Sequence, residues 1–295
     1  MQMRRAKEPR RAGGVPPWVP MLLLAVGFVW VLNRLQLSAS RQGVGEVELG
    51  RYRLHSGPLY FSGAWRNRLE RILRKADRLT LGDTEAIAAL TRELAALSFV
   101  EEVGVPEPQW PDGLVIPLRL REPAACVRVG GDYLPVSDDG VVMAGYSYGP
   151  HEVYGAWLPI LGPTDRLARL GPPTPGDRID DPALLDALKV ARSLQRYLTP
   201  AQQRLLGRIV IDASHETSIA DNLPGGVFLD LEGKRRILFG RPPGSDQPGE
   251  LPVDHKWRSI LSVLEAGEAG PPWDLLDVRF DVPRLALRTE AGDGS

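Results

Sequence analysis

The chain has 295 residues, which is long enough for two modest domains, and its 43% hydrophobic and 25% charged residues are ordinary for globular sequence. A net charge of −1 argues against a nucleic-acid-binding protein, and one cysteine, Cys126, excludes an intrachain disulfide and a multi-cysteine metal site. Because Cys126 lies in the apolar run from Ala124 to Val129, we expect a small buried residue rather than a reactive thiol.

The N-terminal region predicts a membrane anchor. Residues 1–17 are a basic leader, and residues 18–37, from Trp18 to Leu37, are long and apolar enough for a transmembrane helix. The positive-inside rule then places the N-terminus in the cytoplasm and the bulk of the chain outside it. A cleaved signal peptide is the alternative, with a small-residue cleavage site at Ser38-Ala39-Ser40. Under both interpretations, residues 38–295 are expected to lie outside the cytoplasm.

The exported part begins with an expected linker, residues 38–50, followed by a first domain at 51–123. Hydrophobic periodicity predicts a strand, two helices and two strands in this domain, at residues 51–54, 65–79, 84–97, 100–105 and 114–120. Asp83 or Thr84 is the expected N-cap of the second helix. A three-stranded sheet with both helices on one face would bury every apolar stripe.

The second domain, residues 124–288, is predicted to be rich in strands with two helices. Its expected strands are 126–129, 133–136, 141–144, 158–161, 209–212, 227–231, 236–239, 275–280 and 285–288. The expected helices are 182–198 and 253–266. This pattern favours a mixed or antiparallel sheet, and therefore an α+β protein. Residues 145–176 are rich in Gly and Pro, and outside the strand at 158–161 the sequence does not predict their fold. Residues 289–295 are expected to be a disordered tail.

The sequence does not predict a catalytic or metal-binding site. The four histidines, His55, His151, His215 and His255, lack the spacing of metal ligands. The acidic pairs 138–139 and 180–181 are interpreted as turn or helix-cap residues, because neighbouring residues on a strand point to opposite faces. The sequence contains no nucleotide-binding motif and no nucleophile elbow. An exported hydrolase that uses His215 with Asp212 or Glu216 is kept as an alternative.

Two segments are candidate binding surfaces. The helix 65–79 is strongly basic, and the residues proposed for an electrostatic surface are Arg66, Arg71, Arg74, Lys75 and Arg78. These residues are either a solvated helix face or a contact for anionic lipid or an acidic partner. The terminal strand, with Leu285, Ala286 and Leu287, could form a sheet edge to which a partner adds a strand, or its leucines could face the core.

The order of these features resembles the FtsQ/DivIB family of bacterial cell-division proteins. The shared features, in chain order, are the valines at 100, 103 and 105, Trp110-Pro111, the strand 114–120, Glu122-Pro123, the strand 126–129, Asp138-Asp139-Gly140 and the Asp-Val-Arg-Phe strand that ends at residue 280. The weight of the resemblance comes from order and spacing over nearly the whole chain.

The resemblance implies a POTRA-like first domain and a non-enzymatic, single-pass protein of the inner membrane that scaffolds the septal division complex. It also implies that FtsB/FtsL-like division proteins dock on the last strands, where Phe280, Leu285, Ala286 and Leu287 are the expected contacts. No cofactor, nucleic acid or small-molecule substrate is expected. A POTRA-type chaperone of outer-membrane assembly or secretion is the alternative within this layout.

Overall fold

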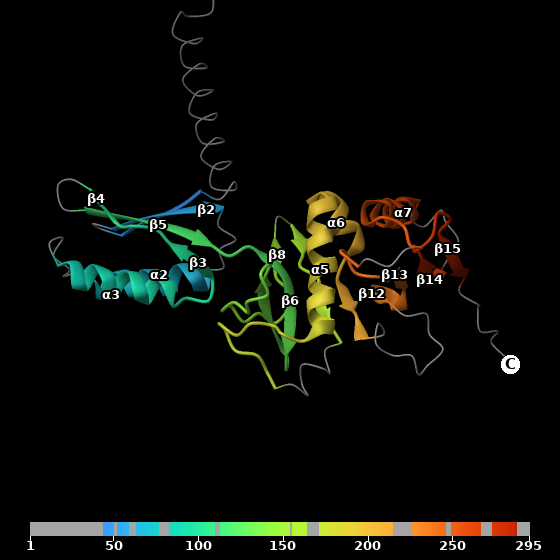
Figure 1. The fold of residues 1–295 in the computed structure, drawn as a ribbon, viewed down its shortest axis with the longest axis horizontal. Coiled ribbons are helices and arrows are strands. Elements are labelled where there is room, and N and C mark those ends of the chain that lie inside the picture. Colours follow the sequence, from blue (N-terminus) through green and yellow to red (C-terminus); the bar gives the residue numbers. More distant parts are fainter. Residues whose placement is uncertain are drawn as a thin grey trace, which may run out of the picture.

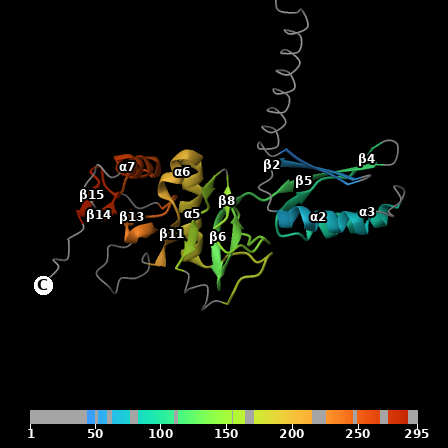
Figure 2. The same ribbon diagram turned by 180° about the vertical axis from the view of Figure 1, so that it is seen from behind.

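A computed structural model shows an α+β protein built from two modules, each with its own hydrophobic core (Figure 1). The structure describes residues 44–49, 52–58, 63–76, 83–109, 113–153, 155–163, 171–214, 226–245, 249–266 and 273–287. For residues 44–49 and 52–58 only the backbone is described. The two modules lie side by side, and the chain passes from one to the other after β5 (Figure 2).

The sheet of the first module is larger than the sequence predicts. Its strands are β1 (Val44–Leu49), β2 (Tyr52–Pro58), β3 (Val100–Val103), β4 (Glu107–Gln109) and β5 (Gly113–Leu120). They follow the order β1-β2-β5-β3, and β4 also pairs with β5. The β2–β5 pair is parallel, and the other pairs are antiparallel. Strand β1 lies within the expected linker 38–50, where Glu and apolar residues alternate over 46–49 in the pattern of a strand.

Two helices, α2 (Gly63–Lys75) and α3 (Thr84–Ala95), cover one face of this sheet (Figure 1). The predicted N-cap of α3 is confirmed, because the Asp83 carboxylate accepts a hydrogen bond of 2.9 Å from the Ala86 N–H. The predicted alternation of β5 is confirmed as well, since four side chains of one face are buried: Leu114, Ile116, Leu118 and Leu120. They pack on the apolar faces of α2 and α3 and form the first core.

The second module has an eight-stranded mixed sheet. Its strands are β6 (Pro123–Val129), β7 (Asp132–Ser137), β10 (Ile160–Gly162), β11 (Ile209–Asp212), β12 (Val227–Leu231), β13 (Arg236–Gly240), β14 (Trp273–Asp277) and β15 (Arg284–Leu287). The order is β15-β14-β13-β12-β11-β10-β6-β7, with parallel pairs at β13–β14, β10–β11 and β10–β6. The predicted mixed sheet is therefore confirmed.

The described residues of the second module include three helices, where two were expected: α5 (Pro182–Tyr197), α6 (Pro200–Leu206) and α7 (Val253–Ala266). Helix α5 packs on β6, β10 and β11, and α7 packs on α5 and α6. Helix α6 was not predicted because it is short, although its sequence contains the residues that typically begin a helix. Thr199 and Gln202 form a capping box, and Pro200 occupies the first turn.

The middle of the second module differs most from the expectation. Residues 141–144 form isolated bridges, Val136 with Val142 and Val141 with Arg178, instead of a strand. Within the segment 145–176, the expected strand 158–161 overlaps the sheet strand β10, and the small hairpin of β8 (Glu152–Val153) and β9 (Ala156–Trp157) was not expected. A short 3-10 helix, Glu232–Lys234, joins β12 to β13.

The expected transmembrane segment, residues 18–37, and the tail, residues 289–295, lie outside the described residues. Within the part of the chain that the structure does describe, no helix has the length and apolar character needed to cross a membrane.

Candidate protein-binding surfaces

Strand β15 is an edge of the eight-stranded sheet. It pairs with β14 on one side, with Leu285 opposite Leu276 and Ala286 opposite Leu275. No described strand pairs with its other side. The opposite edge of the sheet, β7, is covered in part by the following chain, because Tyr133 and Ser147 exchange two backbone hydrogen bonds. The C-terminal edge therefore offers backbone groups that a partner strand could pair with.

The side chains of this edge are exposed to different degrees. Leu285 is 37% exposed and Ala286 is also exposed, while the side chain of Leu287 is outside the described set. Leu285 lies on the same sheet face as its partner Leu276, which is fully buried. The sequence left open whether Leu285 faces the core or an added partner strand. In the structure its side chain lies on the covered face of the sheet, and its position on the edge strand leaves it accessible.

Phe280 sits at the corner between β14 and β15 and is 41% exposed. The guanidinium carbons of Arg279 and Arg284 lie 5.2 and 5.7 Å from the centre of its ring, within the range of cation–π attraction. Arg279 is held in turn by Asp277, with Nη2 2.8 Å from Oδ2 and Nε 3.0 Å from Oδ1. The corner is therefore an aromatic ring between two cations, next to the open edge.

A buried charged pair supports this corner from within the module. The side chain of Lys256 is 2% exposed, and its Nζ lies 2.5 Å from the Glu250 carboxylate and 4.9 Å from the Phe239 ring centre. Burial lowers the pKa of Lys256, although the charge and hydrogen bond of Glu250 oppose that shift. The next residue, Leu251, donates its N–H to the Arg279 carbonyl at 2.8 Å. Glu250 and Lys256 thereby fix the loop on which the corner rests.

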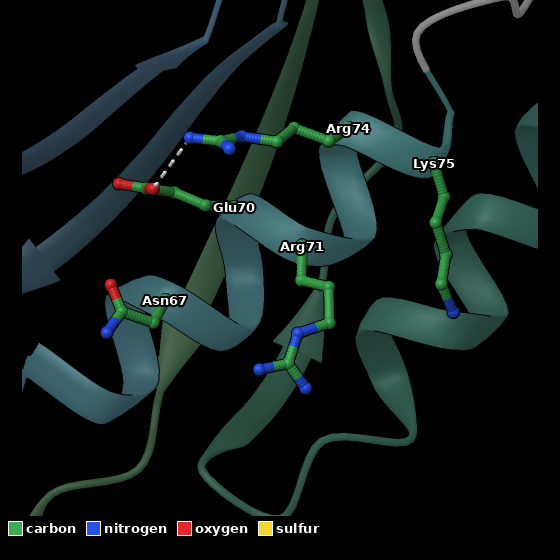
Figure 3. A pocket seen from close by; sticks show the side chains of 5 residues that line it. All are labelled: Asn67, Glu70, Arg71, Arg74 and Lys75. Carbon is green, nitrogen blue, oxygen red and sulfur yellow. Dashed lines mark ion pairs between the residues drawn. The ribbon is translucent and has the colours of Figure 1, made fainter.

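Helix α2 presents the predicted basic surface. The side chains of Arg66, Arg71, Arg74 and Lys75 are exposed, as is that of Arg68, and Arg78 lies outside the described residues. A hollow of about 580 Å³ is lined by Asn67, Glu70, Arg71, Arg74 and Lys75 (Figure 3). Arg74 pairs with Glu70 at 3.6 Å, and Lys75 pairs with Glu93 of α3 at 3.4 Å. Both pairs are solvent-exposed, so each contributes little to stability.

The joint between the modules is a feature that the sequence did not predict. Met143 belongs to the second module in sequence, yet it is fully buried in the first core. Ala144 binds the first module through both of its backbone groups, because its N–H donates to Ser98 Oγ at 2.9 Å and its carbonyl accepts from the Trp65 indole N–H. No local pattern in residues 141–145 distinguishes this role from an ordinary apolar run.

The described residues give no sign of a reactive cysteine or a metal site. Burial raises the pKa of the Cys126 thiol to about 12, despite a hydrogen bond from the His151 N–H, which is the behaviour expected of an inert buried cysteine. The described residues contain no group of three or more potential metal ligands. His215 and Glu216, which carry the hydrolase alternative, lie outside the described residues.

The fold and its surfaces define a two-module α+β protein whose candidate sites are a sheet edge, an aromatic corner and a basic helix. No family model matches the chain. Among curated proteins, the chain is similar to "Cell division protein FtsQ" of Streptomyces coelicolor, with 29% identity over 272 residues, which cover 90% of this chain and 85% of the relative. This similarity supports the resemblance to the FtsQ/DivIB family that the order of the motifs indicated.

Proposed function

We propose that the protein acts in bacterial cell division as a non-enzymatic scaffold of the septal complex. Residues 18–37 anchor it in the inner membrane with the N-terminus in the cytoplasm, and the two modules lie outside. The relative named for cell division supports the process. The proposed mechanism is binding: membrane anchoring raises the effective concentration of the protein for other membrane-bound division proteins.

The open edge of β15 is the observation that carries the binding mechanism. We propose that an FtsB/FtsL-like partner adds a strand beside Leu285, Ala286 and Leu287, and that Phe280 contacts its side chains. Main-chain hydrogen bonds would supply affinity, and the exposed aromatic corner would supply specificity. The covered state of the β7 edge leaves β15 as the more accessible edge of the two in the described sheet.

Localisation in dividing cells tests the cellular role. A fluorescent fusion of the full chain is expected to concentrate at the septum, and depletion of the protein is expected to block septation. A diffuse envelope signal together with normal septation after depletion would overturn the assignment to cell division.

Two neighbouring proline substitutions test strand addition. Backbone N–H groups alternate between the two sides of a strand, so Leu285→Pro and Ala286→Pro each remove a donor from a different side. The variant whose lost N–H pointed toward β14 is expected to be less stable and is recognised by its lower unfolding midpoint. The variant whose lost N–H pointed away from β14 is expected to keep its unfolding midpoint and to lose co-purification with the FtsB/FtsL-like partners. Co-purification that survived this second variant would rule out strand addition.

A further inference from the structure

A stripe of three cations runs along the side of α2 that faces α3. Arg68, Arg71 and Lys75, which we call the basic stripe, recur at spacings of three and four residues and therefore share one side of the helix. Figure 3 shows Arg71 and Lys75 pointing to the same side. Lys75 reaches Glu93 of α3 at 3.4 Å, which places the stripe beside the groove between the two helices. Arg66 lies two residues from Arg68 and so points to the other side.

The α3 side of this groove carries mostly short side chains. Ala89, Glu93 and Ala96 also recur at spacings of four and three, and Glu93 and Ala96 are the positions next to Lys75 and Arg68. Ala89 and Ala96 are exposed and have no side chain beyond the methyl group. A second backbone can therefore approach α3 closely, and no described element covers this outer face of the two helices (Figure 1).

The basic stripe ends at the joint between the modules. Arg68 forms part of a hollow of about 340 Å³, and the rest of its lining comes from both modules. Most of that lining is apolar: Ala64, Trp65, Ala96, Leu97, Phe99, Ala144 and Pro175. The rings of Trp65 and Phe99 stack at 4.9 Å, which makes this lining rigid. We call this space the joint hollow.

The three cations of the stripe differ in whether they already have an acidic partner. Lys75 already faces Glu93, whereas Arg68 and Arg71 form no ion pair with any residue that the structure describes. A guanidinium binds a carboxylate through two parallel hydrogen bonds, which gives direction as well as charge complementarity. Two such groups one helical turn apart fit two carboxylates one turn apart on a partner.

We propose that the groove between α2 and α3 binds an acidic segment of a second division protein. Its carboxylates face Arg68 and Arg71, its backbone lies over Ala89, and an apolar side chain enters the joint hollow. The proposal rests on the proposed role in cell division for the identity of the partner, and it uses a surface far along the chain from β15.

A protein segment fits this surface better than an anionic membrane does. Membrane binding favours cations that are spread over an outermost face, free of acidic residues. Here the carboxylate of Glu93 lies beside Lys75 of the stripe, where it would repel lipid headgroups. The cations also border a groove that leads to an apolar hollow, and a hollow of this size accepts a side chain.

Peptide binding to the purified full-length protein tests the proposal. The probe is a labelled helical peptide of Glu, Ala and Leu, compared with the same peptide carrying Gln in place of Glu. We expect the acidic peptide alone to bind, and we expect Arg68→Glu, Arg71→Glu and the groove-filling Ala89→Trp each to weaken it by about tenfold or more. Arg192→Glu on α5 of the second module is the matched control, because it makes the same change of charge at an exposed arginine away from this groove, and it should leave the affinity within about twofold.

Three outcomes would overturn the proposal. Equal weakening by Arg192→Glu would show that binding follows overall charge. Retained affinity in Ala89→Trp would show that the peptide does not bind in the groove. Binding to phosphatidylglycerol vesicles that depended on Arg68 and Arg71, with no binding of the peptide, would identify a lipid surface instead. Septal localisation of the same variants distinguishes failure of the groove proposal from failure of the proposed role in division. Variants that no longer bind the peptide but still localise to the septum leave the role in division intact.

Discussion

The indole N–H of Trp65 in the first module is bonded to the carbonyl oxygen of Ala144 in the second. The N–H of the same residue donates a hydrogen bond to Ser98 Oγ, and Met143 beside it is buried in the first core. Because both backbone groups of Ala144 are hydrogen-bonded to the first module and its neighbour is buried there, the joint is a packed interface. The open edge at β15 and the basic helix α2 are therefore carried on one continuous body.

Trp65→Phe is expected to loosen this joint. Phenylalanine keeps an aromatic ring against Phe99 but cannot donate to the Ala144 carbonyl, and the loss of this half-buried hydrogen bond is expected to cost about 1 kcal/mol. Denaturant unfolding of the full chain should show this loss, and limited proteolysis should cleave faster near residues 143–146. Ser262→Ala on the exposed face of α7 is the control. An unchanged proteolysis pattern in Trp65→Phe would show that the hydrogen bond does not hold the joint.

Several elements were predictable because their signals are local. The helix expected at 253–266 matches α7, and the strands expected at 209–212 and 227–231 match β11 and β12. The Asp181 cap of α5 was predicted from its sequence as well, and its carboxylate accepts from the Leu184 N–H at 3.1 Å. In each case the periodicity, cap residue or turn lies within the element itself.

The features that were missed depend on distant parts of the chain. Met143 joins a core made of residues 65–120, and nothing within residues 141–144 specifies that partner. Strand β10 pairs in parallel with β6 and β11, so its place in the sheet follows from residues far away in sequence. The candidate surfaces were partly predictable. The sequence indicated the basic residues of α2 and the β15 edge, but the groove and the joint hollow depend on how α2 packs on α3 and could not be predicted from it.

The buried pair Glu250 and Lys256 gives a prediction about stability. Glu250→Gln removes the charge that faces Lys256, and a buried charge without its partner costs about 3–5 kcal/mol. Lys256→Met in the same chain removes the unpaired charge and should restore much of the loss, because an apolar side chain fits beside the Phe239 ring. Urea unfolding of the two single variants and the double variant measures this coupling. Purely additive losses would show that the two residues act independently.

Glycine at position 226 is required by a close approach of two strands. A Cβ atom on Gly226 would lie 2.7 Å from the Gly240 Cα, and its φ of +133° is one that other residues rarely adopt. Gly226→Ala is therefore expected to destabilise the second module by about 1–3 kcal/mol. Gly233→Ala is the contrasting variant, since it also has a positive φ of +79° but open space around it. A thermal melt that ranks Gly226→Ala no worse than Gly233→Ala would contradict the steric argument.

Asp277 should make the corner at Phe280 sensitive to acid. Burial alone would raise the pKa of Asp277, but the hydrogen bonds and charge of Arg279, with the charge of Arg284, lower it below its ordinary value of 3.8. A carboxyl with a lowered pKa in the folded state adds stability above pH 3.8, and that contribution is lost as the pH falls through the folded pKa.

The test compares the wild type with Asp277→Asn across pH. At neutral pH the variant is expected to be less stable by about 1–3 kcal/mol, because Arg279 loses a charged acceptor. Asp139 and Asp254, whose pKa values are also lowered, remain in both proteins, so the difference between the two unfolding curves isolates Asp277. That difference should stay constant between neutral pH and about pH 5 and shrink below about pH 4. A difference that did not change with pH would mean that Asp277 holds Arg279 by geometry rather than by charge.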